Sequence, residues 1–496
     1  MYPGSGERFR HERAGARQIS WKVRQMGKRD KQGESLKRKI TTVAAIAATL
    51  FGLALAGQPA ARGAIGPVVE VEGGPVRGIP ARTPGVMVFK GIPYAAPPVG
   101  DLRWKPPAPV VKWSGVRSAG EFAADCKMPA KMPWPVAPRP TSEDCLYLNL
   151  WTPARSATDK LAVMVWIYGS RFLGGSPADA EYDGDALAQK GVILVTMNYR
   201  NNVMGYLSHP LLREESPQHS SGDYGMLDLL ASLKWVQNNI AKFGGDPGKV
   251  TIFGFSSGGA SVSLLVASPL AKGLFQQAIC ESGGSFGAVR PRTEAEAEKS
   301  EAGYASKFGT TLAELRATPA DELMADPVEA EPVIDGWFLL ADVYDVFKNG
   351  QQNDVPTIVG SNEVEPVDMA DLQVTLYATL QARTGKAKIY QYRFTQQPPV
   401  GPDGLRGPFH GDEVQYVFHN LNMMRRDWTE TDRKVEDIIS SYWVNFAKTG
   451  DPNGAGLPHW STVQEQESSV LEINADPHMI TRPNTKQIEA VKEKFY

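Results

Sequence analysis

Long apolar runs are scarce in this sequence of 496 residues. Only residues 40–55 (ITTVAAIAATLFGLAL) approach the length that a bilayer requires, and no other stretch could cross one. Positive charge is also scarce beyond the N-terminus. Residues 1–39 hold twelve Lys or Arg and four Asp or Glu, a net of +8, so a total of −2 leaves −10 for the remainder. This mildly acidic remainder argues against nucleic acid as a partner. There is no internal repeat, so a repeat architecture is not expected.

The apolar run near the N-terminus has the features of a secretory signal peptide. Basic residues precede it, and Ala54-Leu55-Ala56 follows as an A-x-A cleavage site. We therefore expect residues 1–56 to be a basic extension and signal peptide, started at Met1 or Met26, and 57–65 to be a linker. The alternative is an uncleaved membrane anchor, which the short, alanine-rich run favours less. The sequence predicts export to the periplasm or the exterior, with no stable membrane insertion after cleavage.

Cysteine occurs only three times, and export makes each occurrence interpretable. Cys126 and Cys145 bracket a proline-rich segment, and an oxidising compartment would let them close that loop. On a chain-entropy argument, a bridge across a loop of this length stabilises the fold by about 3 kcal/mol. Cys280 ends an apolar run at 275–280 that predicts a core strand, so a buried, inert thiol is expected there.

The rest of the chain alternates between strand-like and helix-like patterns. Residues 224–243 carry leucines and other apolar residues at helical spacing, and Gly244-Gly245 ends that pattern. Short apolar runs predict buried strands at 68–76, 86–94, 146–151, 161–168, 192–198, 250–255 and 277–280. Strands that alternate with helices indicate right-handed crossovers and a doubly wound, mostly parallel sheet.

One motif in this alternation carries chemistry. Residues 254–258 read G-F-S-S-G and match G-x-S-x-G, in which a serine occupies a strained turn between a strand and a helix. Such a turn would expose the Ser256 hydroxyl above the sheet edge. It would also place the Ser257 N–H at a helix start, where an oxyanion can bind. In a chain with 48 glycines a bare match is weak, so the assignment depends on what surrounds it.

Several other segments carry a family resemblance. They are 91–94 (GIPY), 142–149 (SEDCLYLN), 198–200 (NYR), 239–240 (NI), 243–247 (FGGDP) and 445–453 (NFAKTGDPN). Together with the serine motif they make residues 66–496 resemble the type-B carboxylesterases, a family that includes cholinesterases and bacterial para-nitrobenzyl esterases. The resemblance implies a single α/β-hydrolase domain over 66–496 and a small-molecule ester as substrate. It implies no cofactor and no metal. It also implies that Cys126 and Cys145 form the first disulfide of the family.

The resemblance assigns a catalytic triad residue by residue. Ser256 matches the nucleophile. The acid of the family follows a G-[TS]-N pattern that is matched here at 360–366, which places it at Glu365. The base lies in F-H-G-x-E and is matched by His410. His410 would take the serine proton, and Glu365 would fix the imidazole tautomer and stabilise the imidazolium. Glu363 remains an alternative acid two positions away.

The oxyanion loop departs from the family pattern. The usual H-G-G-G-F reads Tyr168-Gly169-Ser170-Arg171-Phe172. By resemblance, the oxyanion donors are the backbone N–H groups of Ser170, Arg171 and Ser257. Side chains restrict backbone angles that glycine tolerates, so the loop is more constrained than in relatives. Arg171 also adds a cation beside the reacting carbonyl, directed either toward the substrate or toward solvent.

Three further departures concern the pocket. Phe255 stands before the nucleophile, where relatives often have glutamate, and Pro366 replaces a glycine after the acid. Only 45 positions separate Glu365 from His410, where relatives carry a much longer helical insert. A shorter insert predicts a shallower, more open cleft.

Two functions therefore follow from the sequence. The first is an exported serine esterase that hydrolyses carboxylic esters through an acyl-enzyme. The alternative is a hydrolase-fold binding protein with little or no activity because of the altered oxyanion loop. The first is preferred, because the sequence retains all three triad residues. The sequence carries no signal for the oligomeric state.

Overall fold

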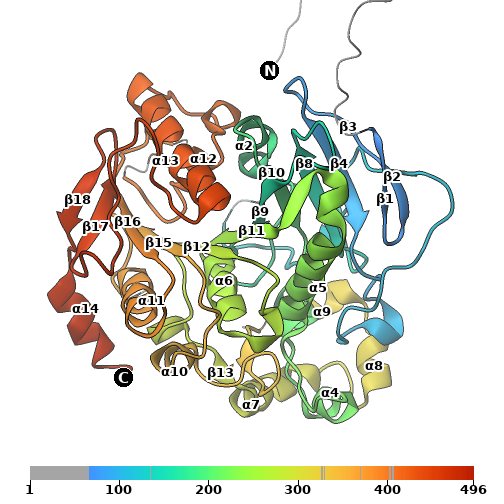
Figure 1. Cartoon of the computed structure of the whole chain (residues 1–496). Coiled ribbons are helices and arrows are strands. Elements are labelled where there is room, and N and C mark those ends of the chain that lie inside the picture. The colour runs from blue at the N-terminus through green and yellow to red at the C-terminus, as the bar shows by residue number, and fades with distance from the viewer. Residues whose placement is uncertain are drawn as a thin grey trace, which may run out of the picture. The chain divides into compact units, whose positions relative to one another are not determined.

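The computed structural model describes residues 66–134, 136–325, 328, 330–368, 370–401, 404 and 407–496. The described residues contain one large sheet of 11 strands, seen in Figure 1. Its strands, in order across the sheet, are β18 (His478–Thr481), β17 (Ser469–Ile473), β16 (Ile389–Phe394), β15 (Thr357–Asn362), β12 (Gln277–Glu281), β11 (Gly245–Phe255), β9 (Leu161–Ile167), β10 (Ile193–Met197), β8 (Tyr147–Thr152), β4 (Met87–Pro93) and β3 (Ile79–Pro80).

The centre of this sheet is parallel and its edges are antiparallel. Every pair of neighbours from β17 to β10 is parallel, whereas β8, β4, β3 and β18 pair antiparallel. The central strands are buried on both faces, as their nearly continuous apolar runs predict. Parallel neighbours bring their carboxyl ends to the same edge, which is where open α/β sheets place their sites. The predicted mostly parallel α/β-hydrolase sheet is confirmed.

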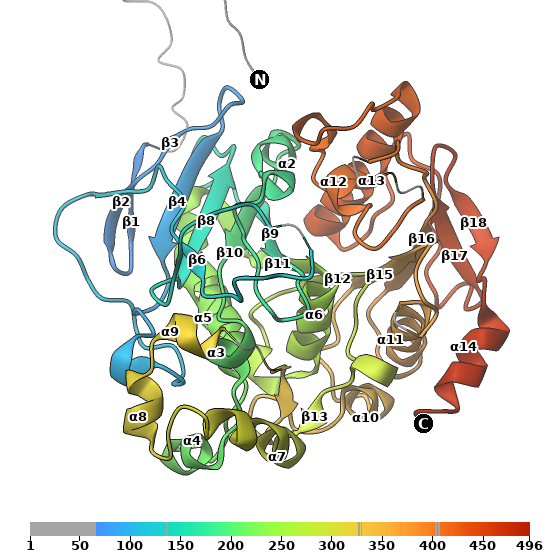
Figure 2. The ribbon, with the colours of Figure 1, turned by 180° about the vertical axis from the view of Figure 1, so that it is seen from behind.

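Helices cover both faces of the sheet. In Figures 1 and 2, α6 and α11 lie on one side of it and α12 and α13 on the other. The helices are α2 (Asp185–Gln189), α3 (Asn202–Tyr206), α4 (Pro210–Glu215), α5 (Tyr224–Asn239), α6 (Ser257–Ala267), α7 (Glu294–Ala305), α8 (Leu312–Ala317), α9 (Ala320–Leu323), α10 (Val343–Lys348), α11 (Asp371–Thr384), α12 (Val414–Val417), α13 (Glu430–Thr449) and α14 (Thr485–Lys492). The smaller strands are β1 (Val68–Val71), β2 (Gly74–Arg77), β5 (Arg117–Ser118), β6 (Asp125–Cys126), β7 (Thr141–Ser142), β13 (Arg292–Thr293) and β14 (Val333–Ile334).

Two predicted elements differ from the structure. The run at 68–76 is not one strand but an antiparallel hairpin, in which Val71 of β1 lies opposite Gly74 of β2. Glu72 and Gly73 form the turn, so the chain reverses its direction within the predicted strand. The predicted helix at 224–243 is α-helical only to Asn239, and its last residues form a 3₁₀ turn.

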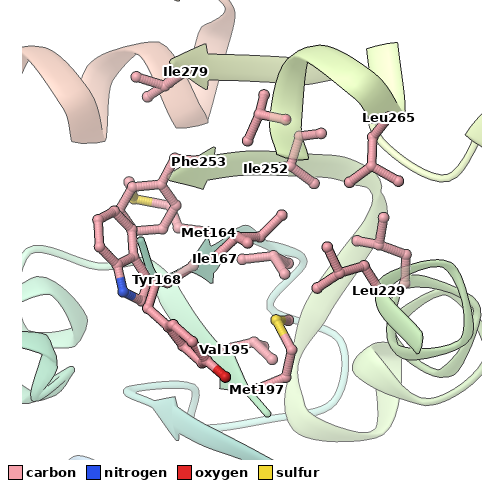
Figure 3. Packing of buried hydrophobic residues seen from close by; sticks show 14 of the residues in the cluster. Met164, Ile167, Tyr168, Val195, Met197, Leu229, Ile252, Phe253, Leu265 and Ile279 are labelled. Carbon is pink, nitrogen blue, oxygen red and sulfur yellow. The ribbon is translucent and has the colours of Figure 1, made fainter. Parts of the chain in front are cut away.

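The core between the sheet and α6 fixes the position of β11, the strand that leads to Ser256. Figure 3 shows side chains of β9, β10, β11 and β12 packed with Leu229 of α5 and Leu265 of α6. Trp166 of β9 packs against Tyr182, Phe253 and Phe418, with ring centroids 4.8 to 5.1 Å apart. Phe418 follows α12 and Phe253 lies three residues before Ser256. This aromatic cluster therefore ties the segment after His410 to the nucleophile strand.

The cysteines occupy two distinct environments. Cys126 at the end of β6 and Cys145 before β8 form a disulfide bond, with Cα atoms 5.0 Å apart. Cys280 is a free thiol buried within β12. The strongly raised pKa of Cys280, caused by burial and then by the charge of Glu281, keeps the thiol protonated and unreactive.

The segment between the acid and the base is short. Its described residues form only α11, β16 and the connecting loops. The predicted signal peptide and linker, residues 1–65, lie outside the described residues. Within the described part of the chain, no helix is both long and apolar enough to span a bilayer.

Candidate active site

The G-x-S-x-G motif forms a sharp turn between β11 and α6. Ser256 has φ 59° and ψ −126°, a conformation that costs a non-glycine residue energy and that projects its hydroxyl from the turn. The Ser256 N–H donates to the carbonyl of Glu281 on β12, 2.9 Å away. A Cβ atom on Gly258 would lie 2.0 Å from the carbonyl oxygen of Ile167, so only glycine fits there. The turn is thus held against the ends of both neighbouring strands.

The structure brings Ser256, His410 and Glu365 into one chain of hydrogen bonds. His410 Nε2 lies 2.8 Å from Ser256 Oγ, and His410 Nδ1 lies 2.5 Å from Glu365 Oε1. The other Glu365 oxygen accepts the N–H of Asn362 at 2.9 Å. Glu363 does not occupy this position, because its side chain is exposed and its carboxylate accepts from Gln397.

This geometry selects one tautomer of His410. An ionised carboxylate can only accept hydrogen bonds, so Nδ1 must carry a proton and donate a hydrogen bond to Glu365. Nε2 is then left unprotonated and can accept from the Ser256 hydroxyl. The Glu365 side chain is 1% exposed, while that of His410 is 49% exposed. A buried carboxylate therefore orients an imidazole that is itself half-exposed.

Two opposing effects set the pKa of His410. Burial lowers the pKa, whereas the hydrogen bond and negative charge of Glu365 raise it, with a further contribution from the charge of Glu413. The acidic neighbours prevail, so the pKa of His410 stands above its ordinary value. A raised pKa makes the imidazole a stronger base when it takes the serine proton.

Glu413 was part of the F-H-G-x-E motif but received no role from the sequence. It is fully buried and accepts hydrogen bonds from Ser282 Oγ at 3.0 Å and from Asn362 Nδ2 at 2.5 Å. Asn362 Nδ2 also donates to the carbonyl of Phe409. Burial, and then the charge of Glu365, raise the pKa of Glu413 to about 7. This network ties the strand end before Glu365 to the loop that carries His410.

The oxyanion loop differs from expectation in its hydrogen bonds. The N–H of Ser170, predicted to face the oxyanion, donates instead to the Ser257 hydroxyl at 2.8 Å. The N–H of Phe172 reaches the same oxygen at 3.4 Å. No described residue accepts from the N–H groups of Arg171 and Ser257. The N–H groups of Arg171 and Ser257 can therefore donate to a ligand oxygen, whereas the N–H of Ser170 already donates to Ser257.

The same loop adopts unusual backbone angles. Arg171 and Phe172 have φ 51° and 56°, in the left-handed region that favours glycine. Each such residue costs about 1–2 kcal/mol relative to a right-handed conformation. The bond from Asn202 N–H to the Phe172 carbonyl, 2.6 Å long, helps to hold the loop in this shape.

Phe255, which stands where relatives often have glutamate, supports the base. Its ring centroid lies 4.9 Å from that of His410. A Cβ atom on Gly411 would lie 2.8 Å from the same ring, so the His410 loop packs closely on Phe255. The imidazole is half-exposed, and the predicted open cleft stays a prediction. A separate cavity of about 250 Å³, with walls that include Trp104, Tyr224 and Trp337, is lined by none of the three triad residues.

Among the described residues, no group of three or more His, Cys, Asp or Glu side chains is placed to hold a metal ion. The reactive groups of the cleft are a serine hydroxyl, an imidazole, a carboxylate and backbone donors. These groups suit acyl transfer, in which a nucleophile, a base and an oxyanion site act together.

Comparisons with known proteins agree with this geometry. The model of the carboxylesterase family matches residues 65–382 and 369–491. The fumonisin B1 esterase of Sphingopyxis macrogoltabida is 36% identical over 464 residues, covering 79% of this chain and 84% of that protein. The para-nitrobenzyl esterase of Bacillus subtilis is 32% identical over 498 residues, with 86% and 98% covered. The crystal structure of the Geobacillus stearothermophilus carboxylesterase EST55 superimposes with a TM-score of 0.74 at 31% identity, covering 86% of this chain and 99% of that one. The chain thus belongs to the carboxylesterase family and is a carboxylic ester hydrolase.

Proposed function

We propose that this carboxylesterase works through an acyl-enzyme formed on Ser256. The serine oxygen bonds to the acyl carbon of the ester, and its proton passes to His410 Nε2. The tetrahedral intermediate then collapses, and the alkoxide leaves as an alcohol with that proton. In the second half, a water molecule gives a proton to His410 and its oxygen to the acyl carbon. The carboxylic acid departs and the Ser256 hydroxyl is restored.

The observation that carries this proposal is the unbroken chain of hydrogen bonds from Ser256 through His410 to Glu365. A serine hydroxyl alone is too weak an acid to attack an ester, and an adjacent base removes that barrier. The charge of Glu365 stabilises the imidazolium that forms when the proton arrives. A hydrolase-fold binding protein would not need this arrangement, whereas that alternative rests on the altered oxyanion loop alone.

Export and domain organisation complete the proposal. The signal-like segment at 1–56 supports secretion, and the disulfide between Cys126 and Cys145 suits an oxidising compartment. We propose that cleavage near Ala56 releases a mature chain in which 57–65 is a linker. Residues 66–496 then form the single catalytic domain.

The proposal is tested by the pH dependence of kcat/KM for a para-nitrophenyl ester. His410 is protonated below its pKa and cannot then accept the serine proton. Activity is therefore expected to fall as the pH drops through a single pKa above about 6.5, the ordinary value for histidine. Above that pKa the imidazole is neutral and kcat/KM should level off. A profile that is flat from weakly acidic to weakly basic pH would contradict the assignment of His410 as the base.

Arg171 supports a proposal about the substrate class. Its side chain is exposed, and within the described residues it has no hydrogen bond or ion pair. The backbone N–H of Arg171 is one of the two free oxyanion donors. The Arg171 side chain therefore extends from a residue that lies beside the reacting carbonyl. We propose that the guanidinium binds a carboxylate on the acyl group of the substrate, since Arg forms charge-assisted, bidentate hydrogen bonds to carboxylates.

The variant Arg171→Gly separates this role from that of a solvated side chain. We expect kcat/KM to fall about tenfold for a hemi-ester of a dicarboxylic acid, the loss of one exposed charge-assisted contact. A neutral ester of equal size should hold its rate or gain. The measurement is the ratio of kcat/KM for the anionic ester to kcat/KM for the neutral ester, in the wild type and in Arg171→Gly. If the ratio is unchanged by the substitution, Arg171 does not select anionic esters.

A further inference from the structure

The hydroxyl of Ser257 stands in an unusual position for a residue that follows a nucleophile. It is the first residue of α6 and is 7% exposed. Its oxygen accepts the N–H of Ser170 at 2.8 Å and lies 3.4 Å from the N–H of Phe172. The side chain thus joins the nucleophile turn to the oxyanion loop, directly beside the reacting serine.

The hydrogen-bonding capacity of a hydroxyl limits what Ser257 can do next. A serine oxygen has two lone pairs and one proton. The two loop N–H groups occupy both lone pairs, so the proton is what remains to be donated. No described residue accepts it. A buried hydrogen-bond donor without an acceptor costs free energy, and a ligand oxygen that accepts its hydrogen bond removes that cost.

We propose that the Ser257 hydroxyl is the third donor of the oxyanion hole, in place of the N–H of Ser170. This inference rests on the proposed function. When Ser256 attacks, negative charge develops on the carbonyl oxygen of the ester. The N–H groups of Arg171 and Ser257 donate to that oxygen, and the Ser257 O–H donates as well. Because the hydroxyl still accepts from Ser170, its proton is polarised and donates more strongly.

This arrangement accounts for the altered sequence of the loop. With a hydroxyl at 257, the N–H of Ser170 no longer has to donate to the oxyanion. Residue 170 therefore does not need the backbone freedom of glycine. The two bonds to Ser257 Oγ also hold the loop in place, although Arg171 and Phe172 have left-handed angles. Because Ser257 is the first residue of α6, the partial positive charge of the helix N-terminus also favours negative charge on the oxyanion.

The test compares Ser257→Ala with Ser263→Ala, a matched control six residues further along α6. Ser263 is also buried, and its hydroxyl has no hydrogen-bond partner among the described residues. For a neutral para-nitrophenyl ester, Ser257→Ala should lower kcat about 10²-fold with little change in KM, the loss typical of one oxyanion donor. Affinity for an aryl trifluoromethyl ketone, which forms a tetrahedral adduct with serine, should fall by a similar factor. Ser263→Ala should match the wild type in both measurements, and melting curves report whether each variant is folded.

Two outcomes would overturn the inference. An unchanged or higher kcat in Ser257→Ala would mean that the hydroxyl adds nothing to the transition state or blocks the hole. A lower kcat with unchanged ketone affinity would mean that the effect arises outside the oxyanion hole. Neither outcome can be confused with failure of the proposed function, because that failure requires Ser256→Ala to remain active.

Discussion

Replacing Ser256 with alanine is expected to lower kcat/KM by at least about 10⁴-fold, because the nucleophile and the acyl-enzyme are both lost. The fold should remain, because among the described residues the hydroxyl bonds only to His410, and alanine can keep the same backbone at φ 59°. The measurement is kcat/KM for a para-nitrophenyl ester by the wild type and the variant, with melting curves for both. Residual activity near the wild-type level would exclude Ser256 as the nucleophile.

The second large effect is expected for Glu365→Gln. Glutamine has almost the same shape but can offer an N–H to His410 Nδ1, which favours the tautomer with the proton on Nε2. That tautomer cannot accept from Ser256, so kcat should fall by about 10⁴-fold, as for the equivalent change in a Ser-His-Asp triad. KM should change little, because the carboxylate is buried behind the imidazole.

Glu363→Gln is the matched control for this prediction. Glu363 is exposed, contacts Gln397 and lies only two residues from Glu365. The same change of charge should leave kcat within about a factor of two of the wild type, as for surface substitutions in general. The reverse ranking of the two variants would assign the acid to Glu363.

The parts of the molecule that follow from the sequence are those set by local patterns. The serine motif predicts its own turn, because glycines and a strand-to-helix change within a few residues define that geometry. Continuous apolar runs predict β9, β10 and β11, because central strands of a parallel sheet are buried on both faces. The motif matches also single out Glu365 and His410, which the fold brings together with Ser256. Glu365 and His410 lie 45 positions apart along the chain, and His410 lies 154 positions after Ser256.

The parts that the sequence does not reveal depend on contacts between distant residues. The split of 68–76 into β1 and β2 depends on the pairing of the two strands across the turn. The bond from Ser170 to Ser257 joins residues 87 positions apart, and no motif signals it. Glu413 lies within a recognised motif, but its role emerges only when Asn362 and Ser282 are seen around it.

The open cleft that the short separation of Glu365 and His410 predicts stays a prediction. The exposure of His410 itself depends on packing that the sequence does not reveal. Its side chain is half-exposed although its ring contacts that of Phe255.

Labelling with a serine-directed organophosphate, followed by mass spectrometry of the intact and digested protein, identifies the nucleophile. We expect one phosphoryl group per chain, located on the peptide that carries Ser256, with activity lost in proportion to labelling. We also expect no adduct on Ser256→Ala. An adduct on another residue, or full activity in a labelled enzyme, would contradict the assignment of Ser256 as the nucleophile.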